Sequence, residues 1–142
     1  MTALIRDVLL TFIGIAGFTL ARYIWRTKRV GQPLVCPLRT RCELVTHSTY
    51  SKILGIPVEA LGMLYYAFVA VFHAGAILRP EIVSPLAAHV SLGVSAAAFL
   101  FSMYLISIQA FVLRQWCTWC LISASFCVLI FGVTFFGTTG VL

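Results

Sequence analysis

Two cysteines, Cys117 and Cys120, stand three residues apart at the start of a long apolar run that extends to Leu142. Residues at this spacing are neighbours on one turn of a helix, so the two thiols can close a small disulfide or open as a dithiol. The partial positive charge at a helix N-terminus favours a thiolate and lowers the pKa of a cysteine there. The spacing therefore predicts a redox-active pair.

A second pair of cysteines, Cys36 and Cys42, lies in the longest polar stretch of the chain. Arg39 and Arg41 stand between them and favour their thiolates, which are the attacking form in disulfide exchange. Two dithiol pairs on one small apolar chain indicate a relay that passes electrons from sulfur to sulfur.

The pairing of these four cysteines stays open, because four cysteines allow three connectivities. Bridges 36–42 and 117–120 would close small loops and add little stability, which is typical of labile, redox-active disulfides. A longer bridge such as Cys42–Cys117 is expected as a transient form if the pairs exchange. The alternatives are a static staple or a zinc site, but zinc mainly organises small soluble modules, so we expect no metal.

The isolated polar residues have simpler interpretations. Cys127 lies about two helical turns deeper than Cys120 and on nearly the same face, and we interpret it as a small buried apolar residue. Glu59 is expected to be an exposed acid at the start of a helix, although an acid near the membrane can also assist proton transfer. His73 and His89 have no obvious partner.

The composition places these cysteines in a membrane protein. The chain has 142 residues, of which 61% are hydrophobic and 10% are charged, and its mean hydropathy is +1.04. A soluble domain would be about 25% charged, so the solvent of this chain is lipid. No basic stripe is interleaved with exposed aromatics, so we expect membrane lipid and no nucleic acid among its partners.

Apolar stretches predict the architecture. We expect a single membrane domain over residues 1–142, an all-α integral membrane fold in the form of a four-transmembrane-helix bundle. The predicted spans are residues 8–25, 58–78, 85–113 and 118–136.

The segment 31–57, between the first two spans, carries the first cysteine pair. Gly31 and Pro33 end the preceding helix. The apolar residues of this segment are too sparse to span a membrane, and they suit a short surface helix between helices 1 and 2. These residues are Leu44, Val45, Ile53, Leu54 and Ile56.

Taken together, these residues resemble the vitamin K epoxide reductase family of membrane thiol oxidoreductases. The resemblance covers nearly the whole chain, and the order of the motifs makes it specific, because the bacterial B-type disulfide oxidases have the Cys-x-x-Cys first. The matching elements are Cys36, Cys42, Ser48, Gly55-Ile56-Pro57, and Cys117-x-x-Cys120 followed by Leu121-Ile122-Ser123-Ala124.

The resemblance implies a role for each of these residues. Cys117 and Cys120 would be the pair beside a membrane quinone of the ubiquinone or menaquinone class, with Cys120 nearest the ring. Cys36 would exchange with an external thioredoxin-like protein, and Cys42 would attack Cys117. Ser48 would donate a hydrogen bond to the quinone, or else cap the short surface helix.

Aromatic residues in the spans are candidates for the quinone pocket, because a quinone is apolar and enters from lipid. The candidates are Tyr65, Tyr66, Phe68, Phe111, Trp116 and Trp119.

Two departures from the family pattern bear on the reaction. The animal enzymes hold the vitamin K ring with an Asn and a Tyr, whereas this chain has no Asn and has Ala124 in place of that Tyr. We therefore expect oxidation of dithiols rather than reduction of an epoxide. Many relatives carry a fused thioredoxin-like domain, and we expect a separate thioredoxin-like protein as the partner here.

The orientation in the plasma membrane can be predicted from the 10 Lys and Arg residues. Four spans place both termini on one side, with Arg6 and Arg79. The other eight basic residues lie on the cysteine side, so the positive-inside rule predicts cytoplasmic cysteine loops. The usual orientation of the family predicts extracytoplasmic ones. The eight are Arg22, Arg26, Lys28, Arg29, Arg39, Arg41, Lys52 and Arg114.

A rival function is a non-catalytic membrane scaffold or a small transporter with structural disulfides. Transport usually requires charged residues buried at mid-span, and the sequence offers no Asp, Glu, Lys or Arg there. A scaffold would lose stability, but no redox activity, when its cysteines are replaced.

Overall fold

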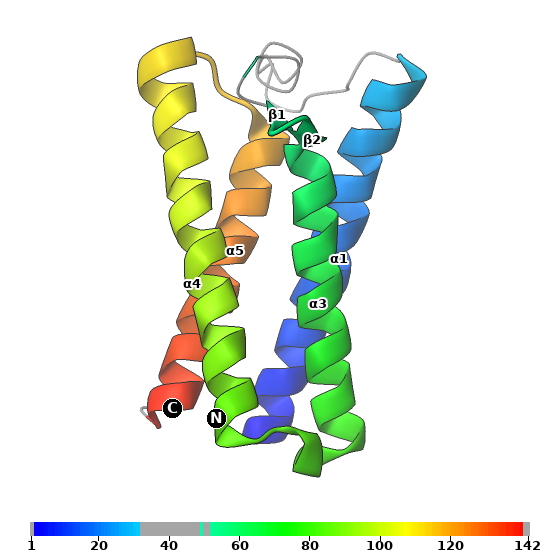
Figure 1. The fold of residues 1–142 in the computed structure, drawn as a ribbon, viewed down its shortest axis with the longest axis vertical. Coiled ribbons are helices and arrows are strands. Elements are labelled where there is room, and N and C mark those ends of the chain that lie inside the picture. The colour runs from blue at the N-terminus through cyan, green and yellow to red at the C-terminus, as the bar shows by residue number, and fades with distance from the viewer. Residues whose placement is uncertain (1, 32–48, 50–51, 141–142) are drawn as a thin grey trace.

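Four long helices form the bundle in a computed structural model that describes residues 2–31, 49 and 52–140 (Figure 1). All four are long and apolar enough to cross a membrane, which confirms the predicted all-α membrane fold. They are α1 (Ala3–Val30), α3 (Val58–Leu78), α4 (Pro85–Ser107) with its π-helical extension η4 (Ile108–Leu113), and α5 (Thr118–Thr139).

Helix α1 extends beyond the apolar stretch 8–25 at both ends because both ends are capped. The Thr2 hydroxyl accepts a hydrogen bond from the backbone N–H of Ile5 at 3.4 Å. Gly31 ends the helix in the left-handed conformation at φ 78°, which favours glycine. The extension brings the basic end of α1, including Lys28, alongside the start of α3.

Helices α3 and α4 are joined by a tight connection. The short 3₁₀ helix η3 (Pro80–Ile82) follows Arg79, whose backbone N–H bonds to the carbonyl of Gly75 at 2.8 Å. The Ser84 hydroxyl then caps α4 by accepting from the N–H of Ala87 at 3.1 Å. The connection therefore turns the chain back through the bundle without a long loop.

Before α3 the chain forms a small antiparallel hairpin, β1 (Lys52–Ile53) and β2 (Ile56–Pro57). Leu54 and Gly55 form its turn with φ of 53° and 82°, as a two-residue hairpin turn of this hand requires. The predicted surface helix is therefore wrong over residues 52–57, because a glycine and β-branched neighbours favour a hairpin. The rest of that segment, with Cys36, Cys42 and Ser48, lies outside the described residues.

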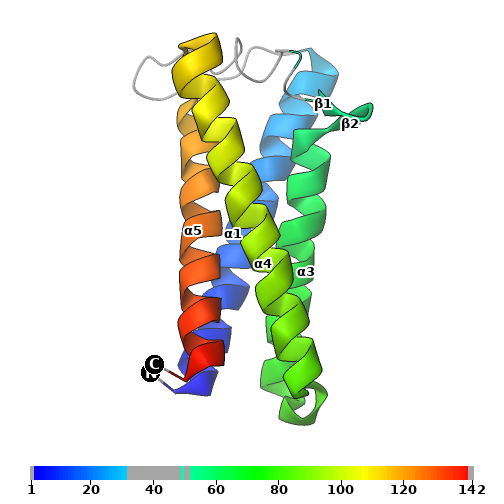
Figure 2. The ribbon, with the colours of Figure 1, turned by 60° about the vertical axis from the view of Figure 1, so that its left-hand side comes forward.

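The helices pack as two pairs, α1 with α3 and α4 with α5, and α1 also contacts α5 (Figures 1 and 2). Small residues let α1 and α3 approach closely, since a Cβ on Gly17 would lie 2.3 Å from the Tyr66 ring. The core contains Leu10, Val69 and Ile130. Figure 2 shows both termini at one end of the bundle, opposite the hairpin and the start of α5.

Candidate functional site

The thiols of Cys117 and Cys120 lie together on the first turn of α5. Cys117 is the N-cap residue, with φ −117° and ψ 112°, and its Sγ accepts a hydrogen bond from the Cys120 backbone N–H at 3.3 Å. Cys117 is completely buried, whereas Cys120 is partly exposed, and both are free thiols. The helix start therefore holds a dithiol in which one sulfur is already solvated by the backbone.

The pKa of Cys117 is lowered from its ordinary value. The main cause is the hydrogen bond from the Cys120 thiol, and the backbone N–H groups of Cys120 and Trp119 add to it. Burial and the negative charge of Glu59 oppose this shift. Cys117 therefore has more thiolate character than an ordinary cysteine, as nucleophilic disulfide chemistry requires.

Gln109 anchors this turn from the end of the preceding span. Its side-chain oxygen accepts a hydrogen bond from the Cys117 backbone N–H at 3.1 Å, and the side chain is buried. The π-helix η4 positions it, and the left-handed Arg114, at φ 52°, redirects the chain into α5. Sequence reasoning missed Gln109, although an amide in an otherwise apolar span is a visible signal.

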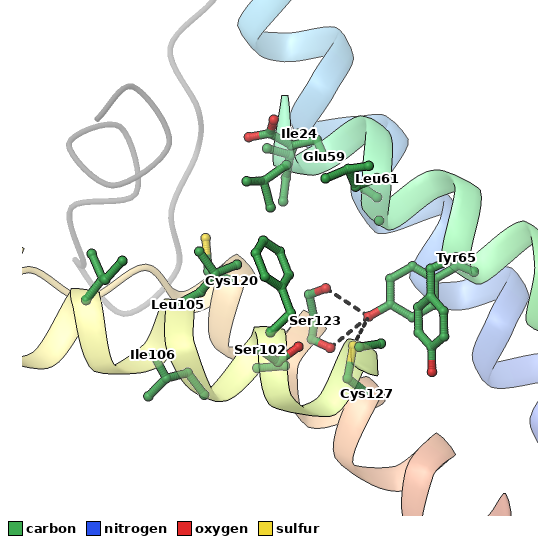
Figure 3. A pocket seen from close by; sticks show the side chains of 18 of the residues that line it. Ile24, Glu59, Leu61, Tyr65, Ser102, Leu105, Ile106, Cys120, Ser123 and Cys127 are labelled. Atoms are coloured by element: carbon green, nitrogen blue, oxygen red, sulfur yellow. Dashed lines mark hydrogen bonds between the residues drawn. The ribbon is translucent and has the colours of Figure 1, made fainter. Parts of the chain in front are cut away.

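A cavity of about 360 Å³ lies between the four helices, and Cys120 forms part of its wall (Figure 3). Ile24, Leu61, Leu105 and Ile106 give it apolar walls on three of the helices. The few polar groups that line it are Glu59, Tyr65, Tyr66, Ser102, Gln109 and Ser123. An apolar cavity with a few polar groups is the usual form of a site for a small apolar ligand.

Only some of the predicted aromatic residues line this cavity. Tyr65 and Tyr66 do, and Phe101 joins them although sequence reasoning missed it. Phe111 and Trp116 are 78% and 46% exposed and point elsewhere. The remaining two candidates make ring contacts outside the cavity wall, Phe68 with Phe72 and Trp119 with Tyr23.

Comparison with known families identifies the chain. The family model described as Vitamin K epoxide reductase family matches residues 8–135, which includes all four spans and the Cys117–Cys120 pair. The chain belongs to the vitamin K epoxide reductase family. It is therefore a multi-pass membrane thiol oxidoreductase of a family whose members use quinone-type electron carriers and a redox partner.

A small residue forms the wall of the cavity just below the dithiol. Ala124 is buried and lines the cavity one turn below Cys120. The methyl group leaves room for a ligand at that height and offers it no hydrogen bond.

Tyr66 links the two halves of the bundle at the floor of the cavity. Its hydroxyl lies 2.7 Å from the backbone oxygen of Ser123, 2.8 Å from the Ser123 hydroxyl and 3.5 Å from the Cys127 sulfur (Figure 3). Cys127 is buried, as predicted for a small packing residue, but it also lines the cavity. The network fixes α3 against α5 beneath the dithiol.

Glu59 is not an exposed acid as predicted. It is 9% exposed, lines the cavity, and its Oε1 lies 3.0 Å from Lys28 Nζ. The prediction was wrong because α1 continues past its apolar stretch and places Lys28 beside the first turn of α3. A carboxylate that is paired with Lys28 thus stands in the wall of the cavity, which Cys120 also lines.

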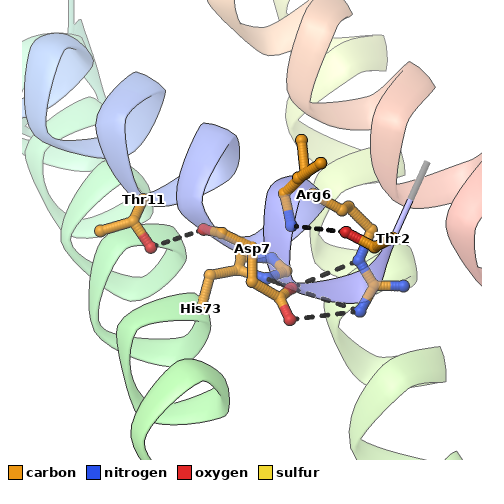
Figure 4. Close-up of polar contacts among 6 residues, drawn as sticks. Thr2, Arg6, Asp7, Thr11 and His73 are labelled. Atoms are coloured by element: carbon orange, nitrogen blue, oxygen red, sulfur yellow. Dashed lines mark hydrogen bonds and ion pairs between the residues drawn. The ribbon is translucent and has the colours of Figure 1, made fainter.

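A second charged cluster lies at the opposite end of the bundle (Figure 4). Asp7 Oδ1 lies 2.9 Å from His73 Nδ1 and 3.2 Å from the guanidinium of Arg6. His73, for which the sequence suggested no partner, is therefore paired with α1. Asp7 and His73 are buried, and neither residue lines the large cavity.

Proposed function

We propose that this protein oxidises a separate thioredoxin-like protein and passes the electrons to a membrane quinone of the ubiquinone or menaquinone class. The observation that carries the proposal is the position of Cys120 in the wall of an apolar cavity inside the bundle. Cys117 lies beside it, at the end of the bundle where α1 ends and α3 begins. A disulfide-forming reaction needs an electron acceptor on one side of the dithiol and a source of thiols on the other.

The cavity suits a quinone by size and by chemistry. Its volume of about 360 Å³ falls in the range of sites for small ligands, roughly 300–1,000 Å³. Tyr65 and Phe101 would hold the ring against aromatic faces, and the aliphatic side chains of α4 would hold an apolar tail. When bound, a quinone supplies a two-electron acceptor next to the dithiol.

Two cysteine pairs would carry out successive steps of the reaction. Cys36 would accept electrons from the partner when a partner thiolate opens a Cys36–Cys42 disulfide and forms a mixed disulfide with Cys36. The partner's second thiol would resolve that mixed disulfide, and the freed Cys42 thiolate would attack Cys117 of a Cys117–Cys120 disulfide. The lowered pKa of Cys117 favours its thiolate once the inner pair is reduced, with the Cys120 thiol as the main hydrogen-bond donor. Gln109 and the first turn of α5 keep the two sulfurs in place.

Reconstitution tests the reaction. The purified protein in lipid is mixed with a reduced thioredoxin-like protein and a short-chain quinone, and the absorbance of the quinone is followed. We expect turnover with the native protein and at least about a 100-fold loss with Cys117→Ala or Cys120→Ala. Ser125→Ala, an exposed change on the same helix, is the matched control and should keep full activity.

The relay is tested with two reductants. Cys36→Ala and Cys42→Ala should abolish electron transfer from the protein partner but leave reduction of the inner pair by a small dithiol intact. Equal loss with both reductants would show that the outer pair is not a relay. If Cys117→Ala or Cys120→Ala retained turnover, the cysteines would have a structural role and not a redox role.

A further inference from the structure

An acid in the wall of the cavity is paired with a base from a neighbouring helix. Glu59, on the first turn of α3, and Lys28, near the end of α1, form an ion pair with 3.0 Å between Lys28 Nζ and Glu59 Oε1. Their side chains are only 8% and 15% exposed. Removing two charges from water is unfavourable, so a buried pair does not by itself indicate a purely stabilising role.

The pair leaves one carboxylate oxygen without a partner. Glu59 Oε2 is buried and makes no hydrogen bond with any of the described residues, although its twin is held by Lys28. Figure 3 shows Glu59 on the wall formed by α3 and Cys120 on the wall formed by α5. The free oxygen therefore belongs to a carboxylate that borders the same apolar space as a reactive thiol.

Glu59 is the acidic residue among the described groups that line the cavity. The other titratable side chains that line it are Tyr65 and Tyr66 from α3 and Cys120 and Cys127 from α5. Lys28 from α1 contacts Glu59 but does not line the cavity. Helix α4 contributes apolar side chains and Ser102, with Gln109 following in η4. Within the described part of the chain, Glu59 is the single carboxyl group lining this space.

We propose that Glu59 is the proton carrier between the inner dithiol and the ligand of the cavity, and that Lys28 positions it. This inference rests on the proposed function. Oxidation of Cys117 and Cys120 to a disulfide releases two electrons and two protons, and formation of a hydroquinone takes up two of each. Glu59 accepts the proton of the Cys120 thiol and delivers it to a quinone oxygen, which returns the carboxylate to its starting form.

The second proton is exchanged with water. It leaves Cys117, whose pKa is lowered chiefly by the hydrogen bond from Cys120, at the cysteine end of the bundle. One proton from water is taken up by the second quinone oxygen, so no further reactant is needed. The Lys28 ammonium fixes the carboxylate through Oε1, which leaves Oε2 free for the transfer.

The test compares three variants in single turnovers. The protein is reduced at Cys117 and Cys120, mixed with a short-chain quinone, and the rate of hydroquinone formation is followed against pH. Glu59→Gln keeps the shape of the side chain and is expected to lower the rate about 100-fold and flatten its pH profile. Glu81→Gln, an exposed acid in η3, is the matched control and should behave as the native protein.

A charge-balanced variant separates proton transfer from structure. Lys28→Met combined with Glu59→Gln removes both charges, so no unpaired charge remains buried even if Glu59→Gln alone fails to fold. If Glu59 carries protons, the double variant stays about 100-fold slow. If Glu59 serves only to neutralise Lys28, the double variant regains the native rate, and the inference is overturned.

A measurement without quinone provides an independent readout. The alkylation of reduced Cys117 is followed against pH by mass spectrometry. The Glu59 charge opposes the lowering of the Cys117 pKa that the Cys120 hydrogen bond causes, so Glu59→Gln should move the midpoint to lower pH. An unchanged midpoint would show that Glu59 does not act on the thiols, while absence of quinone reduction by the native protein would instead refute the proposed function.

Discussion

At the scale of single residues, the reactivity of Cys117 depends on its neighbour. A buried thiol ordinarily resists ionisation, yet the pKa of Cys117 is lowered because the Cys120 thiol, and then two backbone N–H groups, donate to its sulfur. The two cysteines of the motif therefore have different roles before any substrate binds. Cys117 is the thiol whose pKa is lowered, and Cys120 donates the hydrogen bond that favours its thiolate.

This asymmetry predicts the pH dependence of labelling. A group with a lowered pKa is already ionised at a pH where an ordinary thiol is protonated, so alkylation of Cys117 should begin at lower pH than that of a model thiol. Cys120→Ala removes the principal donor, and the midpoint should rise. The measurement is mass-spectrometric alkylation of the reduced protein, with Ser125→Ala as the unaffected control. A midpoint that stays constant or falls in Cys120→Ala would contradict this assignment.

At the scale of the elements, the contact between α1 and α3 depends on glycine. Gly14 faces the backbone of Ala70, and Gly17 lies under the Tyr66 ring, where an added Cβ would be 2.3–2.6 Å from three ring carbons. The same ring carries the hydroxyl that bonds to Ser123 on α5. One close approach thus supports the network beneath the cavity.

Gly17→Ala should therefore destabilise the protein. The new methyl group forces Tyr66 to move, and overpacking of this kind costs about 1–3 kcal/mol. Thermal unfolding in detergent measures the loss. Gly93→Ala on α4 is the control, because a Cβ there meets nothing within 4 Å and the change should be neutral or slightly stabilising. Equal unfolding temperatures for Gly17→Ala and the native protein would refute the close packing.

The cluster of Arg6, Asp7 and His73 links α1 to α3 at the end of the bundle that holds both termini. Asp7→Ala would leave Arg6 and His73 without their shared carboxylate, and breaking a buried pair costs about 3–5 kcal/mol. Unfolding in detergent should show this loss, whereas Glu81→Ala, an exposed acid, should unfold as the native protein does. If both variants unfolded alike, the cluster would contribute nothing to the stability of the bundle.

At the scale of the whole molecule, the bundle has two chemically different ends. The hairpin, Lys28, Glu59 and the dithiol lie at one end, and both termini lie at the other with the cluster around Asp7 (Figures 2 and 4). Of the 10 Lys and Arg residues, the sequence assigns eight to the cysteine side and two, Arg6 and Arg79, to the terminal side. We propose on this charge bias that the cysteine end faces the cytoplasm.

Labelling in intact cells tests the orientation. A membrane-impermeant maleimide should leave Cys36 and Cys42 unmodified until the cells are permeabilised. Glu81→Cys, placed in the η3 turn at the opposite end of the bundle, should be labelled at once and serves as the control. Ready labelling of Cys36 or Cys42 in intact cells would show that the cysteine end faces outward.

The sequence by itself determined the class of the protein. Hydropathy and the Cys-x-x-Cys spacing are local properties, so the four spans, the membrane setting and the dithiol at a helix start could be predicted without a structure. The order of the motifs was enough to indicate the family, which the match over residues 8–135 confirms. These features do not depend on how each helix is rotated about its axis.

The tertiary structure decided which side chains meet. Residues facing lipid and residues facing the cavity are both apolar, so periodicity could not separate Tyr65, which lines the cavity, from the exposed Phe111. Pairs such as Lys28 with Glu59 and Asp7 with His73 join residues far apart in the chain. They depend on helix length, rotation and packing distance together, and these are set only when the helices assemble.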